Sequence, residues 1–253
     1  MKTVLRGSEN YTLTVKLQPM TFNCTKITAV TAFLVLAVWS LNAQTTQEKK
    51  AKLTEQDVGM YNSTKSKEAQ DFFDKGLDYY KKDDSKNALK WFKKAIEKDP
   101  GFVEALDNSG LCCRQLGDFE NAKKYYSKSI DLFPTGNMAH QNLGIVYGIE
   151  KKYDLALEQY KILQKLDSTN PEGYYGAVTI YFALQDIKSA IVNARKTMLL
   201  YEASRSPYLK DAQYLLGLAY FNDGDKSKAK IYLQKAKDNG AEIPKDLAKS
   251  VGL

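Results

Sequence analysis

An alanine recurs at a fixed interval along most of this chain, and this spacing constrains the fold more than any other feature of the sequence. The first four of these alanines are 34 residues apart and the fifth follows after 39 residues: Ala88, Ala122, Ala156, Ala190 and Ala229. A period of this length is typical of a solenoid of helical hairpins, in which each hairpin covers the apolar face of its neighbour. The spacing therefore predicts a binding surface and not a reaction centre.

Other residue types recur in the same frame, which starts at Ala69 and restarts at Val103, Asn137, Pro171 and Lys210. Four of the five repeats have glycine at position 8, and the fourth has Val178. Large residues are common at two further places: Tyr79, Tyr147, Tyr181 and Tyr220 at position 11, with Cys113 in the second repeat, and Phe92, Tyr126, Tyr160 and Leu233 at position 24, with Ala194 in the fourth. Small residues allow two helices to approach closely, and large residues fill the space beside them.

This pattern resembles the tetratricopeptide repeat, a helix–turn–helix unit of 34 residues. The resemblance implies an all-α fold, a right-handed superhelical solenoid of about five repeats that span residues 69–102, 103–136, 137–170, 171–209 and 210–243. Residues 244–253 are expected to cover the last apolar face through Leu247 and Val251, because a solenoid needs a terminal cap.

Turn and capping signals agree with this frame. An aspartate follows the expected turn between the two helices in four repeats, where it can accept hydrogen bonds from the free N–H groups of the second helix: Asp84, Asp118, Asp186 and Asp225. The third repeat has Lys152 there, so its cap is expected to shift toward Asp154. Pro100 and Pro134 are predicted to end the second helix of their repeats, and Asn170–Pro171 to do so slightly later in the third.

The fourth repeat departs most from the pattern. Val178 replaces the glycine, which predicts that its two helices lie farther apart or cross at another angle. Residues 199–209 hold the five extra residues, and we expect the second helix to run long and then turn through residues 204–207. Such an insertion is either a tolerated surface loop or a functional element on one face of the solenoid.

Residues 27–43 are apolar and uncharged, follow Lys26, and end in a small residue before a polar stretch. This arrangement indicates a secretory signal peptide over residues 1–43, cleaved near Ala43 or Gln44, and the alternative is an uncleaved N-terminal anchor. Met20 is an alternative start that would give the leader ordinary proportions. Residues 44–68 are expected to form a polar linker. The leader resembles those of exported Bacteroidetes-type bacterial proteins, so the repeats are expected in the periplasm or cell envelope, where an anchored chain would contact the inner membrane.

The sequence shows no sign of a catalytic site. No phosphate-binding loop, dinucleotide motif or nucleophile motif is present, and we expect no cofactor, no metal and no enzymatic activity. His140 and Cys113 occupy packing positions, and the adjacent Cys112 and Cys113 are too close to form a disulfide. The chain has 37 Lys and Arg against 30 Asp and Glu, and no basic stripe stands out in the sequence. Nucleic acid is therefore not an expected partner, whereas anionic lipid or an acidic partner stays possible for the basic exterior.

The first helix of each tetratricopeptide repeat lines the concave side of the array, and the resemblance implies a partner-binding groove there. Its candidate residues are Phe73, Tyr80, Asn108, Arg114, Gln141, Asn142, Tyr175, Phe182, Tyr214 and Phe221. The two asparagines are expected to hold the backbone of a bound segment, and Arg114 to pair with an acidic group. The Lys/Asn pairing that some members use for a C-terminal carboxylate is incomplete, because position 5 is never Lys and position 9 is never Asn.

The sequence thus predicts a non-enzymatic protein–protein interaction module that binds a peptide or helix of a partner protein in the concave groove. The alternative is a membrane-tethered structural scaffold or a self-assembling envelope component. The identity of the partner is not encoded in any motif of the chain.

Overall fold

The computed structural model describes residues 64–253, and this part of the chain is entirely helical. Its helices form five consecutive pairs and one short final helix: α2 (Lys67–Lys81) with α3 (Ser85–Lys98), α4 (Val103–Gln115) with α5 (Phe119–Leu132), α6 (Asn137–Ile149) with α7 (Tyr153–Leu166), α8 (Glu172–Ala183) with α9 (Ile187–Ala203), α10 (Leu209–Asn222) with α11 (Lys226–Asp238), and α12 (Lys245–Val251). The predicted leader, the alternative start at Met20 and most of the predicted linker lie outside the described residues.

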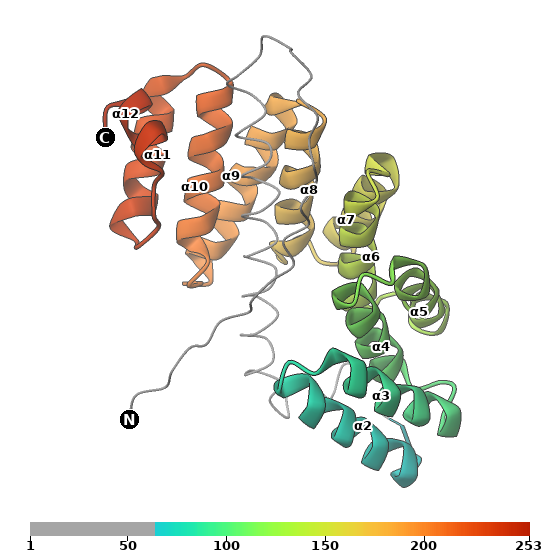
Figure 1. Ribbon diagram of the computed structural model, residues 1–253. Helices are drawn as coiled ribbons and strands as arrows, with labels where there is room; N and C mark the ends of the chain where they lie inside the picture. The colour runs from blue at the N-terminus through green and yellow to red at the C-terminus, as the bar shows by residue number, and fades with distance from the viewer. Residues whose placement is uncertain (1–63) are drawn as a thin grey trace, which may run out of the picture.

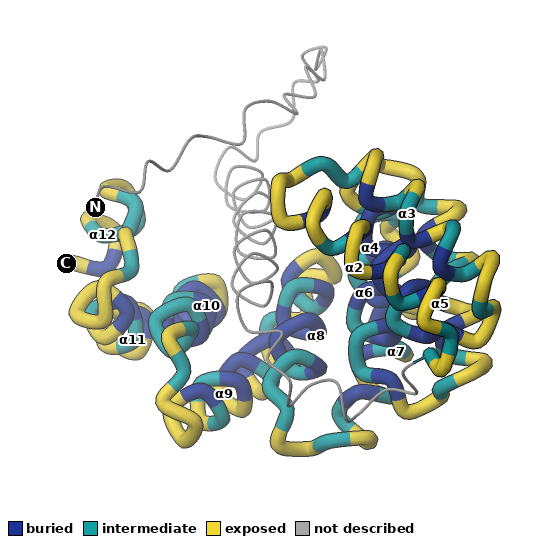
Figure 2. The backbone as a smooth tube through the Cα atoms, turned by 90° about the horizontal axis from the view of Figure 1, so that it is seen from below, coloured by how far each residue is buried: buried dark blue, intermediate teal, exposed yellow. Residues whose placement is uncertain are grey.

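The five pairs stack in chain order into a curved array, as Figure 1 shows from α2 to α12. The first helices of successive pairs contact one another from α4 to α6, from α6 to α8 and from α8 to α10. We call α2, α4, α6, α8 and α10 the inner helices, and α3, α5, α7, α9 and α11 the outer helices, since the outer helices lie on the outside of the arc in Figure 2. The predicted all-α solenoid fold is confirmed.

Each outer helix begins in the same way. Asp84, Asp118, Asp186 and Asp225 each accept a hydrogen bond from the backbone N–H three residues later, which confirms their predicted role as N-caps. Hydrogen bonds from the side chains of the same four donor residues, followed by these backbone bonds, lower the pKa of all four carboxyl groups. The expected shift of the third cap is wrong: Lys152 itself is the N-cap of α7, without a side-chain hydrogen bond, and Asp154 lies in the first turn.

A left-handed residue precedes every one of these caps. The five residues at position 15 of the frame all have φ between 59° and 83°: Asp83, Gly117, Lys151, Gln185 and Gly224. This conformation reverses the chain sharply between inner and outer helix, and it is strained for residues other than glycine. The hairpins therefore share one turn geometry although only two of them have the residue that adopts it freely.

The outer helices end where proline or an aspartate turn prevents their continuation. α3 ends at Lys98 and α5 at Leu132, two residues before Pro100 and Pro134 respectively, as predicted. The prediction for the third repeat is wrong, because α7 ends at Leu166, well before Pro171. Asp167 ends it instead, accepting from the backbone N–H and hydroxyl of Thr169, and Pro171 is the N-cap of α8.

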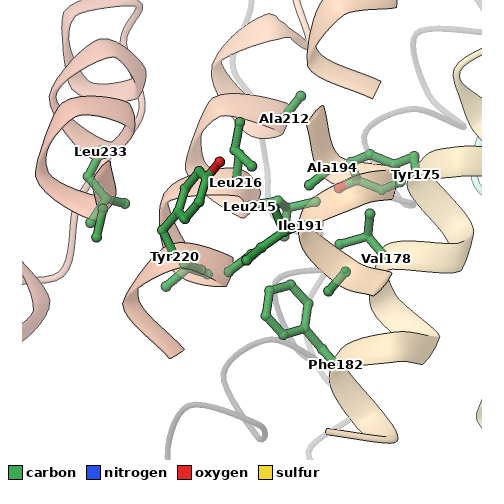
Figure 3. Close-up of a cluster of buried hydrophobic side chains, with 14 of the residues drawn as sticks. Tyr175, Val178, Phe182, Ile191, Ala194, Ala212, Leu215, Leu216, Tyr220 and Leu233 are labelled. Carbon is green, nitrogen blue, oxygen red and sulfur yellow. The ribbon is translucent and has the colours of Figure 1, made fainter. Parts of the chain in front are cut away.

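The fourth hairpin packs differently from the others. In the other four, the glycine at position 8 lies directly under the large residue at position 24; a Cβ atom on Gly110, for example, would lie 2.5 Å from the ring of Tyr126. In the fourth, Val178 on α8 and Ala194 on α9 are both buried in the same apolar cluster (Figure 3). In the other hairpins the small residue is on the inner helix and the large one on the outer helix. In the fourth hairpin the larger residue, Val178, is on the inner helix and the smaller one, Ala194, on the outer helix.

The insertion lengthens α9 to 17 residues, and the chain then turns through residues 204–207 before α10, as predicted. The added turn of helix carries Tyr201, which is 4% exposed and packs against Tyr175 and Tyr208 with ring centroids 6.5 and 5.9 Å apart. This part of the insertion therefore belongs to the core, and the expectation of a simple surface loop is wrong for it.

The last helix, α12, lies over the end of the array. Val251 is buried, and Leu247 and Ile243 pack against the same cluster that contains Leu233 of α11. These three side chains cover the apolar face that a sixth hairpin would otherwise cover, which is the role that the sequence predicts for this segment.

Candidate partner-binding groove

All ten groove residues predicted from the sequence lie on inner helices, two on each of α2, α4, α6, α8 and α10. They differ in how much of each side chain is accessible. The structure separates them into buried residues that hold the array together and half-buried residues that a partner can reach.

Four aromatic candidates are part of the core, and the expectation that they line an exposed surface is wrong. Phe73, Tyr80, Tyr175 and Phe182 are each between 3% and 8% exposed. Their side chains pack against neighbouring helices. The ring centroid of Phe73, for example, lies 5.3 Å from that of Phe92 and 4.9 Å from that of Phe102. The hydroxyl of Tyr80 likewise accepts a hydrogen bond from Gln115 of the next hairpin. Burying an aromatic ring stabilises the array more than exposing it, and this explains their position.

The two predicted asparagines, both 8% exposed, lie one repeat apart on α4 and α6. The side-chain nitrogen of Asn108 donates to the carbonyl of Glu104 at 2.8 Å, and that of Asn142 donates to the carbonyl of Met138 at 2.9 Å. Each bond fixes the amide against its own helix and leaves the side-chain oxygen as the acceptor that a partner's N–H can use.

Arg114 lies where the first three repeats meet. Burial raises the pKa of Tyr80, Tyr126 and Tyr160, which come from repeats one to three, and the positive charge of Arg114 opposes this rise for all three. Arg114 is half-buried, and within residues 64–253 no carboxylate lies within ion-pair distance of its guanidinium group. A half-buried cation without a carboxylate partner is well suited to pairing with an acidic group of a bound segment.

Glu172, which the sequence analysis did not identify, is the first residue of inner helix α8 and links α6 to α9. One carboxylate oxygen accepts from the Gln141 amide at 2.6 Å, and the other accepts from the Tyr201 hydroxyl at 3.2 Å. Gln141 is therefore tied to the fourth repeat and is less available to a partner than predicted. The only sequence signal for Glu172 was its place directly after Pro171 at the start of a helix, and Tyr201 comes from the insertion, which no repeat pattern describes.

The aromatic candidates at the C-terminal end of the groove are more accessible. Tyr214 and Phe221 on α10 are half-buried and pack at the edge of the apolar cluster drawn in Figure 3. Burial raises the pKa of the Tyr214 hydroxyl. Half-buried aromatic rings of this kind are common anchors for protein partners.

Histidine and cysteine have packing roles here. Both ring nitrogens of the buried His140 are bonded within the fold, Nδ1 to Gln159 at 2.8 Å and Nε2 to the carbonyl of Pro134 at 3.0 Å. Cys112 and Cys113 are free and buried. Within residues 64–253 no three histidine, cysteine or acidic side chains gather in a way that would hold a metal ion, and none of the helices there has both the length and the apolarity needed to cross a bilayer.

Comparison of the sequence with known protein families detects the tetratricopeptide repeat in two parts of the chain. Two tetratricopeptide repeat models match the chain, one at residues 103–135 and one at residues 211–239. Among curated proteins, Hsp70-Hsp90 organizing protein 3 of Arabidopsis thaliana is 30% identical over 117 residues. That match covers 43% of this chain and 21% of the relative, so the chain spans about a fifth of the relative's length.

Solved structures show the same fold at low sequence identity. MamA from Desulfovibrio magneticus RS-1 aligns with a TM-score of 0.61 at 20% identity, covering 70% of this chain and 97% of MamA. YrrB, described as a TPR protein with an unusual peptide-binding site, aligns with a TM-score of 0.54 at 19% identity, covering 72% of this chain and 90% of YrrB. Residues 64–253 thus have the solenoid fold of these structures, and residues 103–135 and 211–239 within it match tetratricopeptide repeat models.

Proposed function

We propose that this protein is a non-enzymatic interaction module of the bacterial cell envelope, and that it holds an extended or helical segment of a partner protein in the groove of its inner helices. The observation that carries the proposal is the half-buried guanidinium of Arg114, which has no carboxylate within ion-pair distance among the described residues. It lies where the first three repeats meet, near Tyr80, Tyr126 and Tyr160. An acidic residue of a partner segment would form an ion pair with this guanidinium group and neutralise its charge.

The other candidate residues have different roles along the groove: Asn108 and Asn142 are largely buried, whereas Tyr214 and Phe221 are half-buried. The side-chain oxygens of Asn108 and Asn142 are oriented by their helices and accept backbone N–H groups of the segment. Tyr214 and Phe221 provide apolar contact further along, on α10 of the fifth repeat. This arrangement favours a partner segment with an acidic residue near one end and an apolar residue near the other.

Two further facts support a role in holding proteins. Tetratricopeptide repeats mediate interactions between proteins, and the Arabidopsis relative is named for organising Hsp70 and Hsp90. The envelope location rests on the sequence alone, namely the apolar run at residues 27–43 and the polar stretch after it. Measuring the mass of the mature N-terminus tests it: loss of residues 1–43 supports export with cleavage, and retention supports the anchored scaffold.

Site-specific photocrosslinking in the native host tests the groove. A photoreactive amino acid at position 214 should trap a distinct protein, whereas the same amino acid at Lys161, exposed on outer helix α7, should not. Arg114→Gln should reduce the adduct several-fold, and Lys161→Gln, which removes the same charge from the outer face, should leave it unchanged. Equal adducts from both positions, or an adduct indifferent to Arg114→Gln, would refute the groove as the binding site.

A further inference from the structure

Charge is divided between the two layers of the array. The five outer helices together contain eighteen Lys and Arg and seven Asp and Glu, whereas the five inner helices contain five and eight. The division is invisible in the linear sequence, where lysines and acids alternate, and it becomes a basic outer face only when the hairpins fold. The sequence shows no basic stripe, yet the folded hairpins gather most of the lysines on the outer layer.

Two outer helices, α3 and α11, are the most basic, and each carries five lysines and a single acid, Glu97 in α3 and Asp238 in α11. Only α3 has a tryptophan among its lysines. Lys86, Lys90 and Lys93 are exposed and Lys94 is half-buried. With Leu89 and Glu97, these four lysines line an open depression of about 340 Å³ along one side of the helix. Within residues 64–253, none of these four lysines has a carboxylate within ion-pair distance. Their charges are thus free to meet anions from outside.

Two aromatic rings lie among these lysines. Phe72 on α2 and Trp91 on α3 are half-buried with ring centroids 5.7 Å apart. The ammonium groups of Lys94 and Lys75 lie 4.3 and 5.0 Å from the centroid of the Trp91 ring. Tryptophan surrounded by lysine is the combination that prefers the interface between water and lipid, where the ring meets the acyl boundary and the ammonium groups reach phosphates.

We propose that this part of the first hairpin, defined by Phe72, Lys75, Lys86, Lys90, Trp91, Lys93 and Lys94, is a docking surface for an anionic lipid bilayer. Most of this surface lies on outer helix α3, and only Phe72 and Lys75 come from inner helix α2. A chain docked in this way leaves α4, α6, α8 and α10 open to a partner. The occupant follows from charge complementarity and from the aromatic pair: phosphate groups meet the lysines, and the apolar interface region meets the two rings.

A nucleic acid would also satisfy the lysines, but it fits the rings less well. Phe72 and Trp91 pack on one another, and ammonium groups lie 4.3 and 5.0 Å from the Trp91 centroid, so the faces on which a base would stack are partly occupied while the ring edges stay accessible to lipid. The chain also contains an apolar run of the kind that directs proteins to a membrane, at residues 27–43, which precedes this hairpin in the sequence.

The fluorescence of Trp91 provides a local test. The chain has two tryptophans, so Trp39→Phe in the full chain leaves Trp91 as the single emitter. Its emission should shift to the blue on vesicles of equal parts phosphatidylglycerol and phosphatidylcholine, should not shift on phosphatidylcholine alone, and should return in high salt, which screens the phosphates. A shift of equal size on neutral vesicles, or none on anionic ones, overturns the proposal. So does a shift with a DNA duplex in the absence of any shift with anionic vesicles.

A matched pair of charge variants separates a specific surface from general attraction. In the Trp39→Phe chain, Gln replaces Lys86, Lys90, Lys93 and Lys94 in one variant, and Lys226, Lys230, Lys235 and Lys237 of α11 in the other. Both lose four charges, and the replaced lysines are exposed except Lys94, which is half-buried. The α3 variant should need at least about ten-fold more anionic lipid for a half-maximal shift, because each lysine near such a surface contributes several-fold. The α11 variant should change little; equal losses in the two variants overturn the assignment to α3.

Discussion

Gly76 on α2 packs directly against the ring of Phe92 on α3, so closely that a Cβ atom on Gly76 would lie only 2.4 Å from the ring. Phe92 is completely buried, between α2 and the next hairpin, and its ring has no space into which it can move. The closest approach of the two helices is therefore set by the absence of a side chain at one residue and the presence of a ring at the other.

Gly76→Ala should destabilise the protein even though alanine favours helix more than glycine does. Overpacking of a full core costs about 1–3 kcal/mol, against a gain in helix propensity of about 1 kcal/mol. We expect a net loss of about 1 kcal/mol in the free energy of unfolding, measured by urea titration. Gly101→Ala is the control, because the only atom near its added Cβ is a carboxylate oxygen at 3.4 Å. Equal stability of the two variants would contradict the packing argument.

The reversed pair in the fourth hairpin predicts a strong coupling. Val178→Gly empties a core position, and Ala194→Tyr places a ring where Val178 now lies, so each single variant should lose about 2 kcal/mol or more. The double variant recreates the arrangement of the other hairpins and should lose at least about 1 kcal/mol less than the sum. A double-mutant cycle by chemical denaturation measures this difference, and additive losses would show that the two positions do not face each other.

The strained turn residues offer a stabilising change. Lys151 has φ of 59° and is exposed. Lys151→Gly should remove the strain of the left-handed conformation but increase the entropy of the unfolded chain. The net effect should be a rise of about 0.5–1 kcal/mol in the free energy of unfolding. The reverse change, Gly117→Ala, introduces the same strain at φ of 77° with no atom within 4 Å of the new Cβ. Thermal denaturation should move in opposite directions for the two variants, and a shared direction would contradict the assignment of strain.

Asp107 should make stability fall as pH rises. Burial raises the pKa of this carboxyl, which is 1% exposed, from 3.8 to about 7, although the Ser129 hydroxyl partly opposes the rise. Between about pH 4 and pH 7 the unfolded chain therefore loses its proton before the folded chain does, and the free energy of unfolding decreases over that range.

Asp107→Asn removes this titration. The variant should gain on the order of 2 kcal/mol relative to the natural chain at pH 8, and much less at pH 5. Asp131→Asn, which changes an exposed carboxylate on α5, is the control. Urea titrations at both pH values measure the effect, and a gain that is the same at pH 5 and pH 8 would show that Asp107 does not carry the pH dependence.

Both cysteines of the described chain should resist thiol reagents. Cys112 and Cys113 are at most 1% exposed, and burial raises the pKa of the Cys113 thiol to about 11. The thiolate, which is the reactive form, is therefore scarce at neutral pH. Reaction with a chromogenic disulfide should be slow in the folded protein and fast in denaturant. Rapid reaction of one thiol before unfolding would contradict this packing.

The fold followed from the sequence because its signals repeat. Glycine at position 8 and aspartate at position 16 each describe a contact inside one hairpin, and such contacts are the same in every unit. The groove was harder to predict, since exposure depends on what the next hairpin places nearby. Phe73 and Tyr175 carry the residue types of a binding surface, and only the neighbouring helices bury them. Glu172 was missed because its partners, Gln141 and Tyr201, come from another repeat and from the insertion.

The reversed sizes of Val178 and Ala194 also mean that the five hairpins are not interchangeable. An inner helix taken from any other unit would leave a hole opposite Ala194, and α8 transplanted elsewhere would press a branched side chain into an aromatic ring. The packing of the fourth hairpin therefore depends on its own two helices. Arrays in which the hairpins are shuffled or duplicated must keep α8 and α9 together.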